Sequence, residues 1–569
     1  MRGLKKATEC PKSASKCLKS VTSPDELTQG IGTRECHEFR KKIFNRITPI
    51  SYDTAHKYLK ITRELDYVHA NRFLNRIDKQ IHIADLNITW DIKEIREFAN
   101  KKSMECILDT VGLNDAQSVA WCKAKLLKYG ITLPEKASDI ENIASAKNEK
   151  FWFLKLKQLA SQKFEQVRRS LDLINQSKSP YCSNDQLRQW EWEKEQSLEY
   201  MSKNWFCSAS GELISMLDAY KSNVSNPAIR RAELMVRIKG TEEYSKLLGH
   251  IGYFYTITSP SKYHSHYKTG RPNPKYQNFN VKETNDYLCK QWQKTRAQFH
   301  RENIQVYGLR VVEPHHDGTP HWHLMLFMAP EHAHRVTEIL KFYALEDDGA
   351  ERGAEKNRFN AKEIIPEKGS AQDYIAKYVC KNIDGEYIDK DKYGNDAKTS
   401  AKRITAWASL FRIRQFQFIG GPSVSLWREL RKTKESKSSE LEEIRKAADS
   451  SDWLTYLVLM GGHNIPKQDR PFAIEYKKQL KKHLEGLEAS TLSEHAFNKK
   501  PCSIRSTTNN YPIEDKGWKL LSSPPEQINC SPAPRDGRAV DEASGGYRRA
   551  WGGAPPAGRS SNPVGLGLV

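Results

Sequence analysis

The stretch His321-Trp-His-Leu-Met-Leu-Phe-Met328 is an unbroken run of aromatic, histidine and aliphatic residues, preceded by Pro320 and followed after one alanine by Pro330. This composition predicts a buried β-strand. Alternate residues of a strand point to opposite faces, so the imidazoles of His321 and His323 are expected on the same side, about 7 Å apart along the backbone. Two imidazoles at that spacing can bind one metal ion.

A carboxylate precedes this strand at a useful distance. Glu313 directly follows the expected strand 305–312, and the turn Pro-His-His-Asp-Gly-Thr-Pro separates it from His321. Antiparallel pairing through that turn would place Glu313 beside both histidines. Two imidazoles and one carboxylate leave coordination positions open for substrate oxygens, as a Lewis-acid metal requires. A salt bridge from Glu313 to an arginine is the alternative, and the reserve ligands are His315, His316 and Asp317.

The surrounding sequence is rich in histidine, with ten of the 17 histidines between residues 250 and 334. Two further His-x-His pairs are poorer chelators. His332 and His334 lie at an expected helix start, where residues two apart diverge by about 200°. His264 and His266 lie in a Ser/Tyr/Lys-rich loop, where DNA contact or no function is expected.

A second motif follows in Gly369-Ser-Ala-Gln-Asp-Tyr-Ile-Ala-Lys-Tyr-Val-Cys-Lys-Asn382. Ser370 and Asp373 form a capping box, which predicts that a helix begins here with Tyr374 and Tyr378 one turn apart. Lys377 and Lys381 each follow a tyrosine by three residues. A nearby ammonium favours the phenolate, so each tyrosine is a candidate nucleophile. Alone, such tyrosines are more often amphipathic packing residues.

The whole chain is long and basic. Its 569 residues are 38% hydrophobic and 28% charged, which indicates two or three domains rather than a disordered chain. Ninety-one Lys and Arg against 70 Asp and Glu give a net charge of +21. Nucleic acid is therefore the leading partner class, with a merely soluble basic protein as the alternative.

The distribution of helical, strand-like and Gly/Pro/Ser-rich patterns along the chain predicts four regions. Residues 1–245 are mainly helical, 246–432 form an α+β domain, 433–529 form a linker and helices, and 530–569 form a disordered Gly/Pro/Ser-rich tail. Within the α+β domain the expected strands are 253–258, 305–312, 321–328 and 411–419. After the linker, at 432–451, helices are expected around 453–460 and 472–487.

Cysteine usage and hydropathy indicate a reduced, cytoplasmic protein. The eleven cysteines form no Cys-x-x-Cys pair, which argues against a disulfide framework and a four-ligand zinc site. The basic N-terminus lacks an apolar signal core, and the most apolar stretch, 453–460, is too short to span a bilayer. Secretion and membrane insertion are therefore not expected.

Together the two motifs resemble those of the HUH endonucleases that initiate rolling-circle DNA replication. A His-hydrophobic-His strand is followed about fifty residues later by Tyr-x-x-x-Tyr on a helix. The sequence is most similar to the replication gene A protein family of tailed temperate phages. The similar blocks span about 225–432 and read NPAIRRAELMVRIKG, YFYTITSPSKYHS, YGLRVVEPHHDGTPHWHLMLF, DYIAKYVCKN and FRIRQFQFIGGPSVSLWRELRK.

This resemblance implies a five-stranded antiparallel sheet of ferredoxin-like type, flanked by helices, with the histidine pair on a central strand and the tyrosine helix against it. It implies site-specific nicking of single-stranded origin DNA with Mg²⁺ or Mn²⁺, leaving a 5′-phosphotyrosine and a 3′-OH for the host replicative polymerase. The implied roles are metal binding for His321 and His323, the carboxylate position for Glu313, nucleophiles for Tyr374 and Tyr378, and the accompanying lysine for Lys377 or Lys381.

Elementary chemistry agrees with these roles. Exchange of a phosphodiester for a phosphotyrosine conserves bond energy, so religation needs no nucleotide, and the chain holds no G-x-x-x-x-G-K-[ST] motif. A separate host helicase is therefore implied. Arg412 and Arg414 are expected to contact the DNA backbone or to have no role. The alternatives are a two-tyrosine HUH transposase or relaxase, and a non-catalytic DNA-binding protein with a structural metal.

Overall fold

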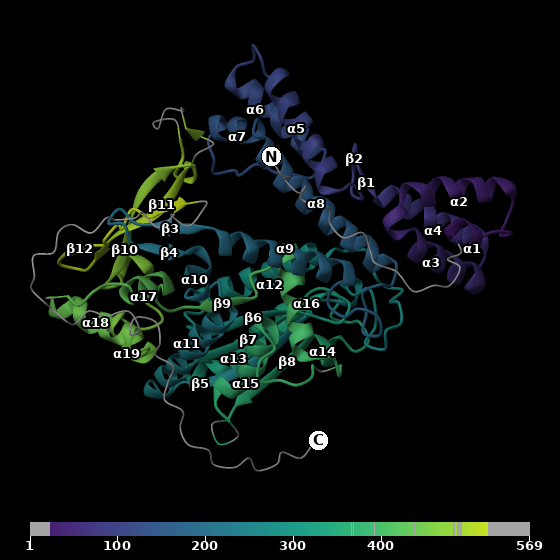
Figure 1. Ribbon diagram of the computed structural model, residues 1–569. Coiled ribbons are helices and arrows are strands. Elements are labelled where there is room, and N and C mark those ends of the chain that lie inside the picture. The colour runs from purple at the N-terminus through teal and green to yellow at the C-terminus, as the bar shows by residue number, and fades with distance from the viewer. Residues whose placement is uncertain are drawn as a thin grey trace, which may run out of the picture. The chain divides into compact units, whose positions relative to one another are not determined.

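The protein divides into two compact units (Figure 1). The computed structural model describes residues 23–521 except 366, 368, 392, 437, 482–483 and 486–491. The first unit lies within residues 1–173 and 482–496, and the second within 174–481 and 497–569. The expected disordered tail, 530–569, lies outside the described residues. No helix in the described part of the chain is both long and apolar enough to cross a membrane, and the eight cysteines described there form no disulfide with one another.

The first unit is built from helices around one apolar core. Trp152 is fully buried in that core, and its indole Nε1 donates to the carbonyl of Ala146 at 2.7 Å. Asp91, Asn114 and Ser138 each begin a helix with a capping box, which satisfies otherwise unpaired amides. The elements are α1 Pro24–Leu27, α2 Arg34–Arg46, α3 Ser51–Glu64, α4 Tyr67–Gln80, β1 His82–Ile83, β2 Leu86–Asn87, α5 Ile92–Leu108, α6 Asp115–Leu127, α7 Asp139–Ala146 and α8 Glu149–Ser170, with short 3₁₀ turns at Thr48–Ile50 and Glu494–Ala496.

A five-stranded antiparallel sheet forms the centre of the second unit, which confirms the predicted sheet. Its order is β8-β5-β7-β6-β9, so β7, the strand with the two histidines, is central. The connection runs β5, α12, β6, β7, α13, α14, β8, α15, α16, β9. The strands are β5 Ile251–Thr258, β6 Tyr307–Pro314, β7 Pro320–Met328, β8 Phe359–Ile364 and β9 Phe416–Ile419.

Helices cover both faces of this sheet, and the alternation of β7 decides which residues each face receives. Trp322, with Leu324 and Leu326, packs into the core shared with α12, α13 and α16. On the opposite face Met325 and Phe327 pack with α11 and α15. His321 and His323 therefore point toward α15. The bounds are α11 Pro227–Leu247, α12 Val281–Arg301, α13 Ala333–Leu345, α14 Ala354–Arg358, α15 Ala371–Ile383 and α16 Ala397–Phe411, with 3₁₀ turns at Ser261–Tyr263 and Pro330–His332.

Residues 174–245 belong to the same compact unit as the sheet. Helix α11 contributes the buried Leu234 and Ile238 to the core on the histidine face. The second unit thus begins well before residue 246, where composition changes; the start of the endonuclease domain itself stays a prediction. The other elements here are α9 Asn184–Lys203, β3 Trp205–Cys207, β4 Leu213–Ser215 and α10 Met216–Lys221, and β13 Lys519–Leu521 pairs with β3.

The C-terminal part differs from two expectations. The expected linker 432–451 contains helix α18, because Leu441 and Ile444 pack into a core with Trp427. The expected helix 472–487 is wrong at its start, where residues 473–480 form strand β10, paired with β11. The helix expected near 453–460 is present. The elements are α17 Val424–Leu430, α18 Ser439–Asp449, α19 Trp453–Leu459, β10 Ala473–Leu480, β11 Phe497–Arg505 and β12 Asn510–Pro512, with a 3₁₀ turn at Lys467–Asp469.

Candidate active site

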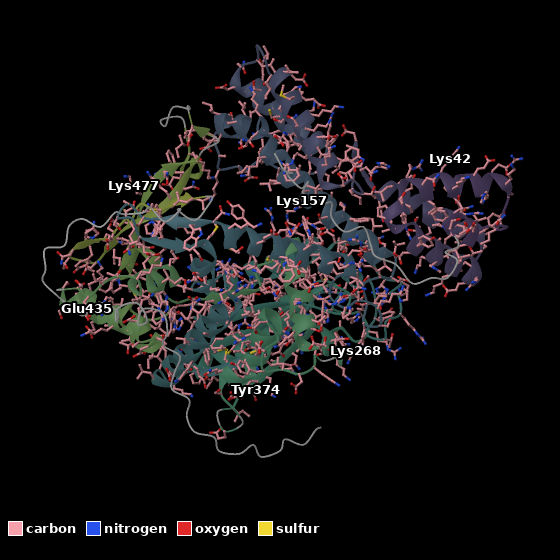
Figure 2. All side chains as sticks on the ribbon, viewed as in Figure 1. Lys42, Lys157, Lys268, Tyr374, Glu435 and Lys477 are labelled. Atoms are coloured by element: carbon pink, nitrogen blue, oxygen red, sulfur yellow. The ribbon has the colours of Figure 1, made fainter. Side chains whose placement is uncertain are left out.

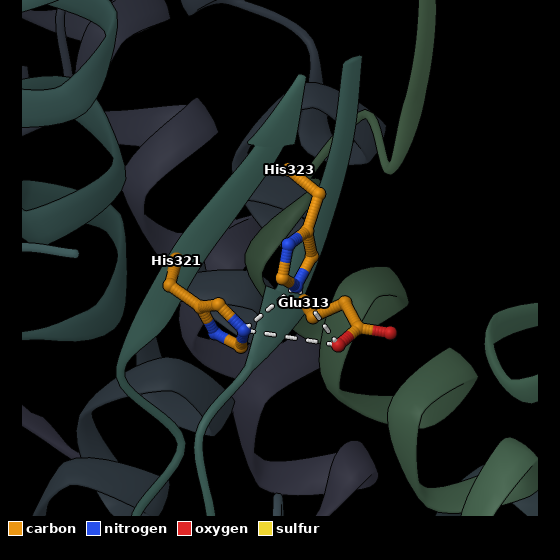
Figure 3. A group of neighbouring side chains, drawn as sticks. All are labelled: Glu313, His321 and His323. Carbon is orange, nitrogen blue, oxygen red and sulfur yellow. Dashed lines mark hydrogen bonds and ion pairs between the residues drawn. The ribbon is translucent and has the colours of Figure 1, made fainter. Parts of the chain in front are cut away.

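Strand pairing brings a carboxylate and two imidazoles together (Figure 3). Glu313 on β6 lies directly opposite His321 on β7. The Nε2 atoms of His321 and His323 are 3.0 Å apart, and Glu313 Oε2 lies 3.7 Å and 3.4 Å from them. All three residues are buried, and their potential ligand atoms lie within 4.8 Å of one another. The arrangement fits the donor set of a divalent metal.

Neighbouring side chains hold this cluster in position. Thr256 Oγ1 hydrogen-bonds His323 Nδ1 at 3.0 Å, which directs the opposite ring nitrogen toward Glu313. The amide of Asn382 donates to Glu313 Oε1, and the ammonium of Lys381 lies 3.2 Å from Oε2. Such surrounding hydrogen bonds fix ligand orientation in metal sites.

Glu313 is charged in this setting. Burial alone would raise the pKa of its carboxyl group, but the ammonium of Lys381 and the hydrogen bond with His323 outweigh burial and hold the pKa well below its usual range. The site therefore offers an ionised carboxylate at neutral pH, which is the form that binds a cation.

Helix α15 delivers one tyrosine to the cluster. The helix begins at Ala371 with Ser370 and Asp373 forming the predicted capping box. The ring of Tyr378 lies 4.2 Å from the ring of His323 and 5.1 Å from that of Phe254, centroid to centroid. Burial, and then the charge of Glu313, raise the pKa of Tyr378 to about 12. The phenol is therefore protonated at neutral pH.

These residues line a pocket of about 140 Å³. Glu313, Tyr378 and both histidines line it together with Lys377 and Lys381. The loop that follows α15 also lines the pocket, through Ile388, Lys390 and Asp391. Three lysines, a tyrosine, Asp391 and the acid–histidine cluster thus line one small cavity.

The other predicted nucleophile lies outside this cavity. Tyr374, labelled in Figure 2, is one turn before Tyr378 and does not line the pocket. The ammonium of Lys362 on β8 lies 4.9 Å from its ring centroid. The structure therefore brings Tyr378, but not Tyr374, to the acid–histidine cluster.

The reserve ligands occupy other positions. Asp317 accepts hydrogen bonds from the amides of Ser265 and Thr319, at 2.8 Å and 3.0 Å, and so secures the β6–β7 turn. The carbonyl of His316 accepts from the amide of Tyr181. The ring of His315 stacks on that of His321 at 4.0 Å. Among the described residues, the group able to hold a metal consists of Glu313, His321 and His323.

The remaining candidates are dispersed. His264 lies 3.8 Å from Asp317, and His334 is 88% exposed beside Glu338. Arg412 ends helix α16 with a left-handed backbone, φ 53°, rather than lying in a strand.

Comparison with known proteins identifies the family. The sequence profile of the bacteriophage replication gene A protein family matches residues 114–386, a range that includes Glu313, His321, His323 and both tyrosines of helix α15. The chain is 35% identical over 511 residues to the probable replication protein P12 of Pseudoalteromonas phage PM2, which covers 85% of this chain and 79% of that protein. The chain belongs to the bacteriophage replication gene A protein family.

Other relatives in the replication gene A family are longer. The replication gene A protein of Escherichia phage 186 is 40% identical over 333 residues, covering 57% of this chain and 48% of that protein. A protein of Salmonella typhimurium named probable replication endonuclease from a prophage-like region is 35% identical over 337 residues, covering 56% of this chain and 42% of that protein. The chain thus matches about half the length of these relatives. No solved structure matches the chain.

Several residues around the cluster of this replication gene A family member were not predicted from sequence. Asn382 could have been predicted near the cluster, because it lies one turn after Tyr378 on the same helix. Thr256 and Phe254 reach the cluster through the pairing of β5 with β7, which pattern alone does not fix. Tyr181 lies far away in sequence, yet its ring is 5.6 Å from the ammonium of Lys381.

Proposed function

We propose that this protein initiates rolling-circle DNA replication of a phage or prophage by nicking one strand at the origin through a tyrosine. The observation that carries the proposal is the position of Tyr378, whose ring is 4.2 Å from His323 in a pocket with Glu313 and His321. The order β8-β5-β7-β6 and the β-α-β-β-α-β connection support assignment to the ferredoxin-like HUH nuclease fold.

Tyr378 is the proposed first nucleophile. Its phenolic oxygen attacks the scissile phosphorus and loses its proton; the bond from phosphorus to the 3′-oxygen breaks, and that oxygen leaves as a hydroxyl group. The 5′ end remains on the tyrosine as a phosphodiester, so the reverse reaction can reseal the strand. The free 3′-OH serves the host replicative polymerase, and unwinding is left to a host helicase.

His321, His323 and Glu313 are the proposed ligands of Mg²⁺ or Mn²⁺. When bound, such an ion acts as a Lewis acid on phosphate oxygens. Thr256 and Asn382 keep two of the ligands oriented. Lys377, which lines the pocket, is placed to contact a DNA phosphate, and Lys381 to balance the charge of Glu313.

Tyr374 is the proposed second nucleophile. Replication must nick again after a full circuit while the first tyrosine still carries the old 5′ end, so a second phenol is needed. Its position outside the pocket implies that it acts after a rearrangement of helix α15 or of the bound strand, not in the first step.

The proposal is tested by incubating the protein with single-stranded DNA fragments that together cover the DNA around its gene. Each fragment is incubated once with Mn²⁺ and once with excess chelator. The expected result is a covalent protein–DNA adduct on one fragment, formed with Mn²⁺ alone and absent in the variants His321→Ala and His323→Ala. DNA binding without any adduct would indicate the non-catalytic alternative. Full cleavage in chelator would contradict the metal role.

A further inference from the structure

The loop between β5 and α12 contains a short hairpin with an exposed tip, here called the 266–272 hairpin. Its first and last residues form a β-bridge, and the amide of Tyr267 donates to the carbonyl of Arg271 at 2.8 Å. The carbonyl of Tyr267 accepts from the amide of Gly270 at 2.8 Å, and Gly270 has a left-handed backbone, φ 78°. These features are typical of a hairpin with a three-residue loop. Tyr267 and Arg271 therefore lie opposite each other, on the same face.

Buried hydrogen bonds fix the base of this hairpin. Asp317 in the β6–β7 turn accepts from the amide of Ser265 at 2.8 Å. The side-chain amide of Asn273 donates to two carbonyls of the same loop, each at 2.8 Å. Ser265 and Asn273 are 5% and 6% exposed, whereas residues 267–269 and 271 are exposed. The tip thus extends from a rigid base, so little conformational entropy is lost when it binds a ligand.

The 266–272 hairpin lies beside the candidate active site. Strand β5 ends at Thr258, which is directly opposite His321, so the loop leaves the sheet next to the acid–histidine cluster. Farther along the loop, the ring of His264 lies 5.1 Å from the ring of His315, which in turn stacks on His321 at 4.0 Å. The hairpin is therefore within reach of a DNA strand bound at the cluster.

Two cations of the tip lack a carboxylate partner among the described residues, unlike the other cations of this loop. Lys262 and Lys275 each pair with a carboxylate, at 2.7 Å and 2.6 Å. Lys268, labelled in Figure 2, and Arg271 form no such pair within the described chain. Beside them Tyr267 is 43% exposed. Proteins that bind single-stranded nucleic acid combine exposed aromatic rings with such cations.

We propose that the 266–272 hairpin binds the single strand next to the scissile phosphate. Tyr267 stacks on one unpaired base, and Lys268 and Arg271 contact neighbouring phosphate groups. The inference rests on the proposed nicking function and adds to it a positioning site for the strand, outside the pocket of Tyr378. A duplex is a poorer partner, because its bases already stack on one another and offer Tyr267 no free face.

The tyrosine is tested with full-length variants on three DNA probes of equal length, in EDTA so that no strand is cut. The probes are a thymidine oligonucleotide, a strand of abasic nucleotides and a duplex. Tyr267→Ala should bind the thymidine strand about fivefold or more weakly, because one stacked base is lost, and should bind the other two probes unchanged. Tyr267→Phe should retain full affinity, and so should the control Tyr52→Ala, which removes a tyrosine that is 40% exposed on α3.

The cations are tested through the salt dependence of binding. Lys268→Gln combined with Arg271→Gln removes two phosphate contacts, so the slope of log K against log salt should fall by about 1 to 1.5 on the thymidine and abasic strands alike. Lys60→Gln combined with Lys93→Gln makes the same change in net charge at two exposed lysines of the first unit. This control should alter the slope less.

An unchanged affinity of Tyr267→Ala for the thymidine strand would overturn the proposal. An equal loss on the abasic strand or the duplex would also overturn it, because stacking on an unpaired base cannot cause such a loss. So would an equal loss in Tyr267→Phe or Tyr52→Ala, or a salt slope that falls equally in the two double variants. Binding is measured without cleavage, so failure of the hairpin to bind DNA is distinguishable from failure of the protein to nick it.

Discussion

At the scale of single residues, orientation of Glu313 decides whether the cluster can hold a cation. Its Oε1 accepts from the amide of Asn382, while Oε2 faces both histidines. Asn382 contacts no proposed substrate atom, so its role is positioning. The cation site thus depends on Asn382, which is not itself one of the proposed ligands.

Replacing Asn382 by alanine should weaken metal binding. Loss of a hydrogen bond that orients a ligand typically costs 10- to 100-fold in metal affinity. We expect the Mn²⁺ concentration for half-maximal cleavage to rise about tenfold, with the rate at saturating Mn²⁺ largely restored. Asn357→Ala, at an exposed position on α14, is the matched control. An unchanged Mn²⁺ requirement in Asn382→Ala would contradict the positioning role.

The two tyrosines should differ in the first cleavage step. Tyr378→Phe removes the hydroxyl group beside the cluster and should reduce single-turnover cleavage about a thousandfold or more, as loss of a nucleophile does. Tyr374→Phe should reduce it less than tenfold, because Tyr374 lies outside the pocket. Rapid-quench measurement on a short single strand gives both rates. Equal losses in the two variants would show that the tyrosines are equivalent in this step.

At the scale of elements, helix α11 links the sheet to the C-terminal helices. Gly240 faces α19 so closely that a Cβ atom there would lie 2.7 Å from the Cβ of Trp453 and 2.8 Å from the amide nitrogen of Leu454. On the same helix, the guanidinium of Arg237 stacks over the ring of Phe418 at 3.7 Å. The sheet and α19 are therefore joined through one helix.

Gly240→Ala should destabilise the protein in spite of the better helix propensity of alanine. Overpacking of this kind costs about 1–3 kcal/mol, against a gain of about 1 kcal/mol from propensity. We expect a net loss of about 1 kcal/mol, within a range of about 0–2 kcal/mol, in urea unfolding. Lys239→Ala, next along the helix with an exposed side chain, should be nearly neutral. A Gly240→Ala protein that is more stable than the unmodified one would show that α19 can shift away from the added methyl group without loss of folding free energy.

The elements also show where sequence reasoning succeeds. The expected strands 253–258, 305–312 and 321–328 correspond to β5, β6 and β7. They were predicted because a short apolar run bounded by turn residues indicates a buried strand. Strand β8 was not found, since Phe359-Asn-Ala-Lys-Glu-Ile364 is polar at an edge. The stretch from residue 473 has helix-forming residues, but its pairing partner begins only at residue 497, and that distant partner makes it a strand.

The candidate site was likewise predicted where local pairing fixes it and missed where tertiary packing decides. His321, His323 and Glu313 were predicted to lie together because one tight hairpin fixes their pairing. The unequal positions of Tyr374 and Tyr378 were not predicted, because helical spacing fixes their mutual distance but not which turn of the helix meets the sheet.

At the scale of the whole molecule, a buried histidine connects stability to pH. His463 stacks on Tyr307 of β6 with ring centroids 4.0 Å apart, and within the described chain neither ring nitrogen has a hydrogen-bond partner. Burial, and then the charges of Arg470 and Arg237, lower the pKa of His463 to about 3. The folded protein therefore holds the neutral ring.

Acid should destabilise the fold through this residue. The unfolded chain takes up a proton near pH 6.5, whereas the folded one does so only near pH 3, so stability present above pH 6.5 is lost as pH falls toward 3. From pH 6.5 to 5 the loss is about 2 kcal/mol. His463→Phe retains a stacking ring without a titrating group and should reduce the pH dependence of urea unfolding by about that amount. An unchanged pH dependence would contradict the neutral buried state.

Tyr378 is proposed to attack DNA beside the acid–histidine cluster. The most direct test is to trap the covalent adduct formed with single-stranded origin DNA and Mn²⁺ in the first turnover, digest it, and identify the modified residue by mass spectrometry. The nucleotide is expected on Tyr378, with little on Tyr374, and no adduct is expected when both are replaced by phenylalanine. A nucleotide mainly on Tyr374 or on any other residue, or an adduct in the double variant, would contradict it.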